Sequence, residues 1–294
     1  MRILVLRALG LGDLMAAVPA LRALRAAFPQ TEITLAAPEW LRDAVERIEA
    51  VDRLLPTEEL GRIDFERPDL AVNLHGKGPQ SVERLLATRP RHVITYKGWA
   101  GDWPAELHEM ARWCHLLQRN GIRCDPDDFR LRPLGPRTNQ VVIHPGASTG
   151  ARRWPVERYE AVALALRDVV VTAGPGEYDL ARHVSPDPVN GSLAELMDLI
   201  ATARLVICGD TGVAHVATAY GTPSVLLFGP VSPDIWGPRR GPHRVLWHGE
   251  TGDTFADEPD PGLLKITVEE VLDAVGGVLC EQSESVSSEP ATSA

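Results

Sequence analysis

The chain has 294 residues, of which 44% are hydrophobic and 24% charged, and its formal net charge at pH 7 is −10. The length suits two domains of ordinary size, and the composition is typical of a folded globular protein. The acidic balance disfavours general nucleic-acid binding, which needs a basic surface, but it is compatible with a local basic pocket for a small anion.

The N-terminal half alternates short apolar runs, which predict buried strands, with longer segments whose apolar residues recur at helical spacing. Proline and charge then become frequent over 123–139, which we interpret as a linker because few contacts cross such stretches. The strands are expected at 2–8, 32–37, 51–56, 69–74 and 91–96, and the helices at 12–28, 40–48, 79–87 and 105–120.

The second half repeats this alternation, which predicts an α/β fold with two doubly wound, Rossmann-like domains facing each other across a cleft. We place the domains at 1–122 and 140–280. Residues 281–294 are rich in Ser and Glu and lack apolar content, so we expect a disordered tail there. The strands of the second half are expected at 141–148, 168–174, 204–212 and 223–230, with helices after Pro155, from Tyr178 and over 192–203.

No apolar run approaches the ~20 residues that span a bilayer, and the start of the chain does not resemble a signal peptide. We therefore expect a cytoplasmic protein. The four cysteines are scattered without a C-x-x-C pair, which argues against a disulfide framework and against a zinc site. They are Cys114, Cys124, Cys208 and Cys280.

The first motif is "LGLGDLMAAVPAL", at the junction of the first strand and helix. Gly10 and Gly12 allow a ligand to approach the backbone, and a helix N-terminus offers unpaired N–H groups. Asp13 has two interpretations: it caps the helix, or it acts as a general base at the end of the strand. The motif is not G-x-G-x-x-G, so a dinucleotide fingerprint is weak.

Two further glycine turns follow strands of the second half. In "IHPGASTGARRWP", Arg152 and Arg153 follow a glycine-containing loop and precede a helix. They are either solvated surface arginines or a phosphate site with charge-assisted hydrogen bonds. In "TAGPGEYDLA", Glu177 begins a helix, where it complements the helix dipole or accepts from ribose hydroxyls.

The segment "CGDTGVAH" forms a tight turn from a buried strand into a helix. The backbone N–H groups of Thr211 to Ala214 would make a seat for a diphosphate. His215, considered alone, would be an ordinary core histidine. The chain has no G-x-x-x-x-G-K-[ST], no D-x-D and no His/Cys cluster at metal-ligand spacing. A metal-free enzyme would have to neutralise a leaving diphosphate with arginine and a helix N-terminus.

From Met1 to about Cys280 the chain resembles glycosyltransferase family 9, the heptosyltransferase-like enzymes. The resemblance is carried by "RILVLRALGLGDLMAAVPALRALRAAFP", "DLAVNLHGKGPQS", "HPGASTGARRWP", "AGPGEYDLA" and "LIATARLVICGDTGVAHVATAYGTPSVLLFGP". It implies a GT-B-type fold and an inverting, metal-independent transfer of a sugar, in glycan biosynthesis, from a nucleotide diphosphate such as ADP-heptose. No cofactor is expected.

The resemblance also implies roles for single residues. It places Asp13 as the general base toward the acceptor hydroxyl. Arg152 stands where the family usually has a lysine, which keeps the charge but changes the geometry. The donor-binding residues are then Gly146, Arg152, Glu177, Asp210, Thr211, Gly212, Val213 and His215, and the acceptor-side residues are Gly10, Gly12, His75 and Lys77.

The expected partners are a nucleotide-sugar donor and a glycan or glycolipid acceptor, with no nucleic acid. Peripheral contact with an acceptor held at the inner face of the membrane stays open. Two other functions also stay open: a sugar-nucleotide epimerase or hydrolase of similar fold, and a non-catalytic nucleotide-sugar-binding protein. The presence of Asp13 argues against the last of these.

Overall fold

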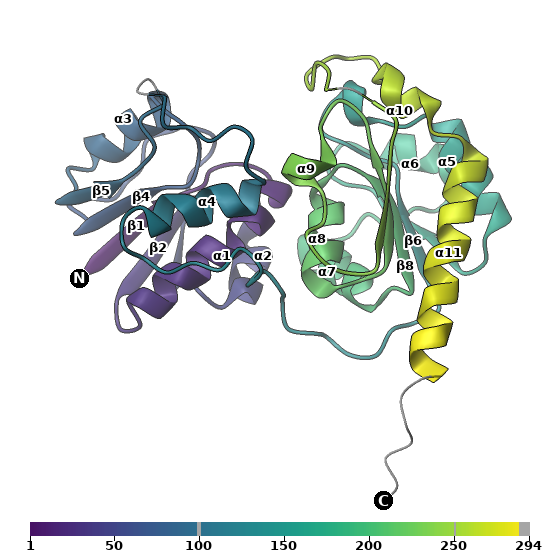
Figure 1. Cartoon of the computed structure of the whole chain (residues 1–294), viewed down its shortest axis with the longest axis horizontal. Coiled ribbons are helices and arrows are strands. Elements are labelled where there is room, and N and C mark those ends of the chain that lie inside the picture. The colour runs from purple at the N-terminus through teal and green to yellow at the C-terminus, as the bar shows by residue number, and fades with distance from the viewer. Residues whose placement is uncertain (99–100, 250, 288–294) are drawn as a thin grey trace, which may run out of the picture. The chain divides into compact units, whose positions relative to one another are not determined.

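A computed structural model of the chain describes residues 1–98, 101–249 and 251–287 (Figure 1). The chain divides into two compact units. The N-terminal unit comprises Met1–Arg132 together with the short segment Leu193–Met197, and the remaining described residues form the C-terminal unit. The boundary after Arg132 falls inside the segment 123–139 that the sequence indicates as the linker.

The N-terminal unit is built on a parallel sheet with the strand order β3-β2-β1-β4-β5. Its central strand pairs on both sides, with Val5 opposite Leu35 and Val72. Continuous apolar runs are what a parallel sheet covered on both faces requires. The strands are β1 (Arg2–Leu6), β2 (Glu32–Ala37), β3 (Arg53–Pro56), β4 (Leu70–Asn73) and β5 (His92–Ile94).

The helices of this unit follow the strands, and α1 is buried on all sides over its middle turns. In α1, Leu14, Leu21 and Leu24 recur at helical spacing and are fully buried. The helix packs against α4. The helices are α1 (Leu11–Ala27), α2 (Arg42–Ile48), α3 (Gln80–Ala87) and α4 (Glu109–Gln118), with a 3₁₀ turn over Glu39–Leu41.

The C-terminal unit has a second parallel sheet, with the strand order β10-β9-β8-β6-β7. Its core gathers apolar side chains from the strands and from the last helix, including Ile143, Ile207, Leu227 and Val275. Figure 1 shows that helix, in yellow, running along one side of the unit. The strands are β6 (Val141–His144), β7 (Val169–Val171), β8 (Leu205–Gly209), β9 (Ser224–Phe228) and β10 (His243–Trp247).

Six helices and a 3₁₀ turn (Gly150–Arg152) belong wholly to the described part of this unit, and α7 begins with the segment Leu193–Met197 of the N-terminal unit. α5 and α6 pack against each other, and α11 packs against α5, β9 and β10. The helices are α5 (Val156–Ala165), α6 (Tyr178–Val184), α7 (Leu193–Thr202), α8 (Gly212–Tyr220), α9 (Pro233–Trp236), α10 (Pro261–Lys265) and α11 (Val268–Ser287).

Each sheet has one point where the strand order reverses direction. In the N-terminal unit it lies between β1 and β4, and in the C-terminal unit between β6 and β8. Open α/β sheets bind ligands beside this point, at the carboxyl ends of the strands. The loops that leave β1, β4, β6 and β8 there each carry a glycine-containing motif of the sequence.

Two expectations are corrected by the structure. A disulfide joins Cys114 to Cys124, whose Cα atoms are 5.1 Å apart. The turn after α4, which passes through Gly121 at φ 78°, brings the two cysteines together, and no C-x-x-C spacing signals this. The tail is also shorter than expected: α11 continues to Ser287, because a helix already anchored by Val275 adds one backbone hydrogen bond per residue. Residues 288–294 lie outside the described residues.

Candidate active site

Asp13 lies in the first turn of α1, at the carboxyl end of β1. The N-cap of this helix is Gly10, so Asp13 is the third helical residue and not the cap itself. Its Oδ2 accepts the backbone N–H of Gly10 at 3.3 Å. The Asp13 side chain keeps 30% of its surface exposed. The carboxylate therefore stabilises the helix N-terminus and still reaches solvent, so the structural and the chemical interpretation are compatible.

A buried arginine contacts Asp13 from the protein interior. Arg7 directly follows β1 and is 1% exposed. Its Nε donates to the carbonyl oxygen of Asp13 at 2.9 Å, and its Nη2 lies 3.2 Å from Asp13 Oδ1. The same Nη2 donates to Glu109 Oε1 at 3.1 Å, and Nη1 donates to the carbonyl oxygen of Leu74. The guanidinium thus connects the loop after β1, the loop after β4 and helix α4.

Glu109, which opens α4, is the counter-charge of this buried arginine. It is 4% exposed and accepts from Arg7, from the indole N–H of Trp113 at 2.8 Å and from Arg112. Arg112 in turn donates to the carbonyl oxygens of Pro104, Ala105 and Leu107, which fixes the segment before α4. A buried carboxylate with three donors is satisfied, as a buried charge must be.

His75 follows β4 beside the Asp13 loop. Burial lowers the pKa of His75 from 6.5 to about 4; the positive charge of Arg7 adds to this effect, and Asp13 opposes it. The imidazole is therefore neutral near pH 7. Its Nδ1 is buried and has no hydrogen-bond partner among the described residues. Asn73 Oδ1 accepts the His75 backbone N–H at 3.1 Å, which fixes the start of this loop.

The other predicted acceptor-side residues are less enclosed. Gly12 lies in the first turn of α1 and is partly buried, as is Gly10. Lys77, two residues beyond His75, is exposed. The structure thus places Gly10, Gly12, Asp13 and His75 around the ends of β1 and β4, and it leaves the Lys77 side chain in solvent.

In the C-terminal unit, Arg152 and Asp210 come together from the loops after β6 and β8. Arg152 Nη1 lies 3.3 Å from Asp210 Oδ2, and Asp210 is 5% exposed. A Cβ atom at Gly209 would lie 3.1 Å from the Arg152 carbonyl oxygen, so glycine permits this close approach. Arg152 Nε is buried without a hydrogen-bond partner in the described part of the chain. This arginine retains donor capacity for an anion.

The N-terminus of α8 lies beside this pair. Thr211 is the N-cap, in an extended conformation, and its side chain makes no capping hydrogen bond. The first-turn N–H groups of Gly212 and Val213 have no acceptor within the helix, as at any helix start. The N–H groups expected to seat a diphosphate were those of Thr211 to Ala214. The Ala214 N–H does not belong to this set, because it donates to the Thr211 carbonyl oxygen at 3.1 Å.

His215 lies on α8 and is 7% exposed, with its ring edge-on to Trp236 at 5.8 Å between centroids. Its position one residue beyond the first turn puts it close to the same helix end as Thr211 and Val213. The packing against Trp236 is what a core histidine shows, so the structure gives this residue a structural contact in addition to the predicted donor role.

Glu177 lies across the end of β7, against the loop after β6. Its Oε2 accepts the backbone N–H of Gly174 at 2.9 Å and lies 3.5 Å from His144 Nε2. A Cβ atom at Gly146 would lie 2.1 Å from the same Oε2, so only glycine leaves room for this carboxylate. Burial lowers the pKa of His144 against the opposing charge of Glu177. His144 Nδ1 is 3.0 Å from Thr172 Oγ1.

Sequence reasoning did not single out Arg7, Glu109 or His144. Arg7 follows an apolar run inside an expected strand, and Glu109 lies within the expected helix 105–120. Their only signal is burial of a charge, which a sequence does not display. The eight predicted donor residues, in contrast, all lie at the ends of β6, β7 and β8 or on the first turns of α8.

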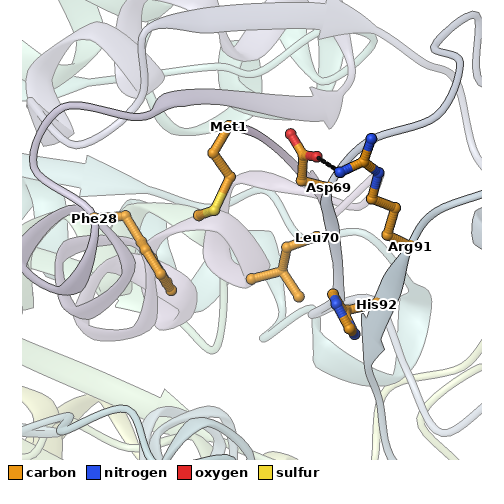
Figure 2. Close-up of a pocket in the computed structure, with 6 residues that line it drawn as sticks. All are labelled: Met1, Phe28, Asp69, Leu70, Arg91 and His92. Atoms are coloured by element: carbon orange, nitrogen blue, oxygen red, sulfur yellow. Dashed lines mark ion pairs between the residues drawn. The ribbon is translucent and has the colours of Figure 1, made fainter.

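A surface cavity of about 510 Å³ lies elsewhere in the N-terminal unit (Figure 2). The residues that line it precede or begin β1, β4 and β5 or follow α1, so it lies at the amino ends of the strands, away from Asp13. Figure 2 shows the ion pair of Asp69 with Arg91, 3.3 Å apart, at its rim. The lining residues are Met1, Phe28, Asp69, Leu70, Arg91 and His92.

Within the described ranges, no group of three or more His, Cys, Asp or Glu side chains is arranged to hold a metal ion. The same ranges contain no helix with the length and apolar character needed to cross a membrane.

The model of glycosyltransferase family 9 (heptosyltransferase) matches residues 106–256. The chain is 25% identical to lipopolysaccharide heptosyltransferase 2 of Escherichia coli K12, over 96% of this chain and 99% of that protein.

Two solved structures show the same fold. The structure of E. coli ADP-heptose lipopolysaccharide heptosyltransferase II superposes with a TM-score of 0.77 at 23% identity, over 96% of this chain and 100% of that one. E. coli heptosyltransferase WaaC with ADP gives 0.70 at 18% identity, over 95% and 100%. The predicted GT-B-type α/β fold is confirmed. With the family model covering half of its length, the chain belongs to glycosyltransferase family 9, and it is a glycosyltransferase.

Proposed function

We propose that the protein is an inverting, metal-independent glycosyltransferase that moves a heptose or a related sugar from an ADP-linked donor to a hydroxyl of a glycan or glycolipid. The observation that carries the proposal is the Asp13 carboxylate. It sits at the carboxyl end of β1, partly exposed and held by Arg7 and by the Gly10 N–H. ADP and heptose are named for related structures, which supports the choice of donor.

The proposed reaction begins with proton transfer. Asp13 accepts the proton of an acceptor hydroxyl while that oxygen attacks the anomeric carbon of the donor sugar. The attack comes from the face opposite the diphosphate, so the C–O bond to the diphosphate breaks and the anomeric configuration inverts. The neutral imidazole of His75 is proposed to lie beside the same acceptor.

The departing nucleoside diphosphate is negative and must be stabilised as the bond breaks. We assign this role to Arg152 and to the N-terminus of α8 at Thr211, Gly212 and Val213. Arg152 is already oriented by Asp210, and its side chain is 26% exposed. A helix N-terminus adds aligned N–H groups and a partial positive charge. These groups supply the neutralisation without a metal ion.

Glu177 is proposed to bind the ribose of the nucleoside. Its Oε2 is occupied by the Gly174 N–H, so Oε1 remains to accept from hydroxyl groups. We further propose that Lys77, which is exposed, meets an anionic acceptor. For an acceptor such as lipopolysaccharide, named for the relatives, transfer would take place in the cytoplasm at the inner membrane face.

A thermal-shift series tests the donor half of the proposal. ADP, GDP, UDP and dTDP, and their sugars, are added to the protein in excess EDTA. A ligand at ~100 times its dissociation constant adds roughly 2.7 kcal/mol of stability. We expect ADP to raise the melting temperature selectively. No shift with any nucleotide, or a shift that EDTA abolishes, contradicts the proposal. Hydrolysis or epimerisation of the ADP-sugar without an acceptor would indicate the alternative enzyme class.

A further inference from the structure

The residue behind the proposed base carries an inference of its own. Arg7 is fully buried, and its hydrogen bonds use Nε, Nη1 and Nη2 together. Two of them go to Asp13, one to its carbonyl oxygen and one to its carboxylate. The planar fork of a guanidinium holds two acceptors in a fixed relative geometry, which an ammonium group cannot do.

We propose that Arg7 is a positioning residue that holds the Asp13 carboxylate in one orientation for proton transfer, with Glu109 as its counter-charge. The base role of Asp13 on which this rests belongs to the proposed function. Arg7 touches neither substrate; it acts through Asp13.

The contacts explain how one side chain does this. Asp13 Oδ1 faces Arg7 Nη2 at 3.2 Å, and Oδ2 faces the Gly10 N–H at 3.3 Å. The two donors approach different oxygens, so rotation of the carboxylate breaks both contacts. The bond from Arg7 Nε to the Asp13 carbonyl oxygen, at 2.9 Å, fixes the backbone from which the side chain leaves. The same guanidinium therefore fixes both the orientation of the Asp13 carboxylate and the position of the Asp13 backbone.

Arg7 also sets where Asp13 lies relative to the acceptor-side loop. Its Nη1 donates to the carbonyl oxygen of Leu74, the residue before His75. The loops after β1 and β4 are thereby tied at the point where the strand order reverses. A shift of about 1 Å in such a geometry lowers a rate by about a hundredfold. The hydrogen bonds of Arg7 thus fix the position of Asp13 relative to the His75 imidazole.

Glu109 makes the buried cation possible. It accepts from Arg7 at 3.1 Å and also from Arg112, so two arginines are balanced by Glu109 and Asp13 together. The face of the Trp113 ring lies 4.9 Å from the Arg7 guanidinium carbon and excludes water on that side. A buried, hydrogen-bonded pair of this kind has one favoured geometry, because any other leaves a charge unpaired.

The test uses Arg7→Lys and Arg7→Met, each made in the wild-type chain and in Asp13→Asn. The matched control is Arg22→Met on α1, where the partly buried Arg22 pairs with Asp128. Folded protein is quantified by circular dichroism, and kcat and KM are measured with an ADP-sugar donor. We expect kcat to fall about 10-fold in Arg7→Lys and about 100-fold in Arg7→Met, with the donor KM changed less than about 3-fold. Arg22→Met should match the wild type.

The double variant separates positioning from a structural role. In Asp13→Asn, adding Arg7→Lys or Arg7→Met should lower kcat less than about 3-fold further, because the group through which Arg7 acts is gone. Equal losses in both backgrounds would overturn the proposal. Arg7→Lys carries this comparison if Arg7→Met does not fold.

A crystal structure of Arg7→Lys gives a readout that does not depend on activity. The proposal predicts that the Asp13 carboxylate leaves its position or occupies more than one rotamer, while α1 and β1 stay in place. An unmoved, single Asp13 conformer would overturn the positioning role even if the protein is active. Lack of transfer by the wild-type chain would instead count against the proposed function, and the crystallographic result would still decide the role of Arg7.

Discussion

Replacing Asp13 by asparagine separates the chemical role of this side chain from its structural role. Asparagine has nearly the same shape, and its single carbonyl oxygen can keep one of the two contacts that the carboxylate makes, with Arg7 or with the Gly10 N–H. Its amide nitrogen then faces the other donor and loses that hydrogen bond. It cannot accept a proton at neutral pH.

The two effects differ in size. The lost contact is long, at 3.2 or 3.3 Å, and the Asp13 side chain is 30% exposed, so we expect a loss of about 1–2 kcal/mol in the free energy of unfolding. A domain stable by about 5–15 kcal/mol stays folded at 25 °C after such a loss. General-base catalysis contributes about 10²- to 10⁴-fold, which is about 2.7–5.4 kcal/mol of the activation barrier. The rate should therefore fall far more than the folded fraction.

The assay measures kcat, donor KM and melting temperature on the same preparations. For Asp13→Asn we expect kcat to fall by about 10²- to 10⁴-fold and the melting temperature to drop by about 2–8 °C. Donor KM should stay near the wild-type value, because the proposed donor-binding residues belong to the C-terminal unit. Turnover within about threefold of wild type, in protein that melts normally, would refute the assignment of Asp13 as base. A parallel loss of folding and activity would refute the separation of roles.

Three further changes test the donor half-site and the buried histidine. Arg152→Met should weaken ADP binding, measured by calorimetry, by about 10- to 100-fold, because it removes a charge-assisted contact. The control Arg153→Met removes the neighbouring charge and should leave ADP binding near the wild-type value. Gly146→Ala places a Cβ atom 2.1 Å from Glu177 Oε2, so the flexible carboxylate must move. Nucleoside affinity should then fall about 10-fold, with little change in melting temperature. Unchanged affinity would contradict the proposed contact of Glu177 with the ribose. Because the pKa of His75 is lowered from 6.5 to about 4, the unfolded chain binds a proton in this interval that the folded chain does not. The stability contributed by neutral His75 is therefore lost as the pH falls through that interval. In urea melts, the free energy of unfolding of His75→Asn should decline less steeply with falling pH than that of the wild type. An identical decline would contradict the lowered pKa.

The sequence predicts which loops hold the candidate site residues, and the structure places those loops after the strands. Parallel strands alternate with helices, so the carboxyl ends of all strands lie at one edge of each sheet. That rule places Asp13 and His75 together, and Arg152 with Asp210, without any knowledge of contacts. Gly146 and Gly209 permit close contacts that the sequence does not display, since Cβ atoms there would meet Glu177 and Arg152.

What supports these residues could not be predicted from spacing. The contact of Arg7 with Glu109 joins residues 102 positions apart, and nothing in an apolar run that ends in arginine shows that the charge is buried. The disulfide of Cys114 with Cys124 depends on the path of one turn. β10 was not predicted from the sequence. It is an edge strand whose residues are only partly buried, so its apolar pattern is weak.

The most direct test of the account is the stereochemistry of transfer in the absence of free metal. Proton NMR follows an ADP-activated heptose and a heptose-deficient lipopolysaccharide with the wild-type protein in excess EDTA. The account predicts a sugar on the acceptor with the anomeric configuration opposite to that of the donor, and one ADP released for each sugar transferred. Retention of configuration, or a reaction that EDTA stops, would contradict it.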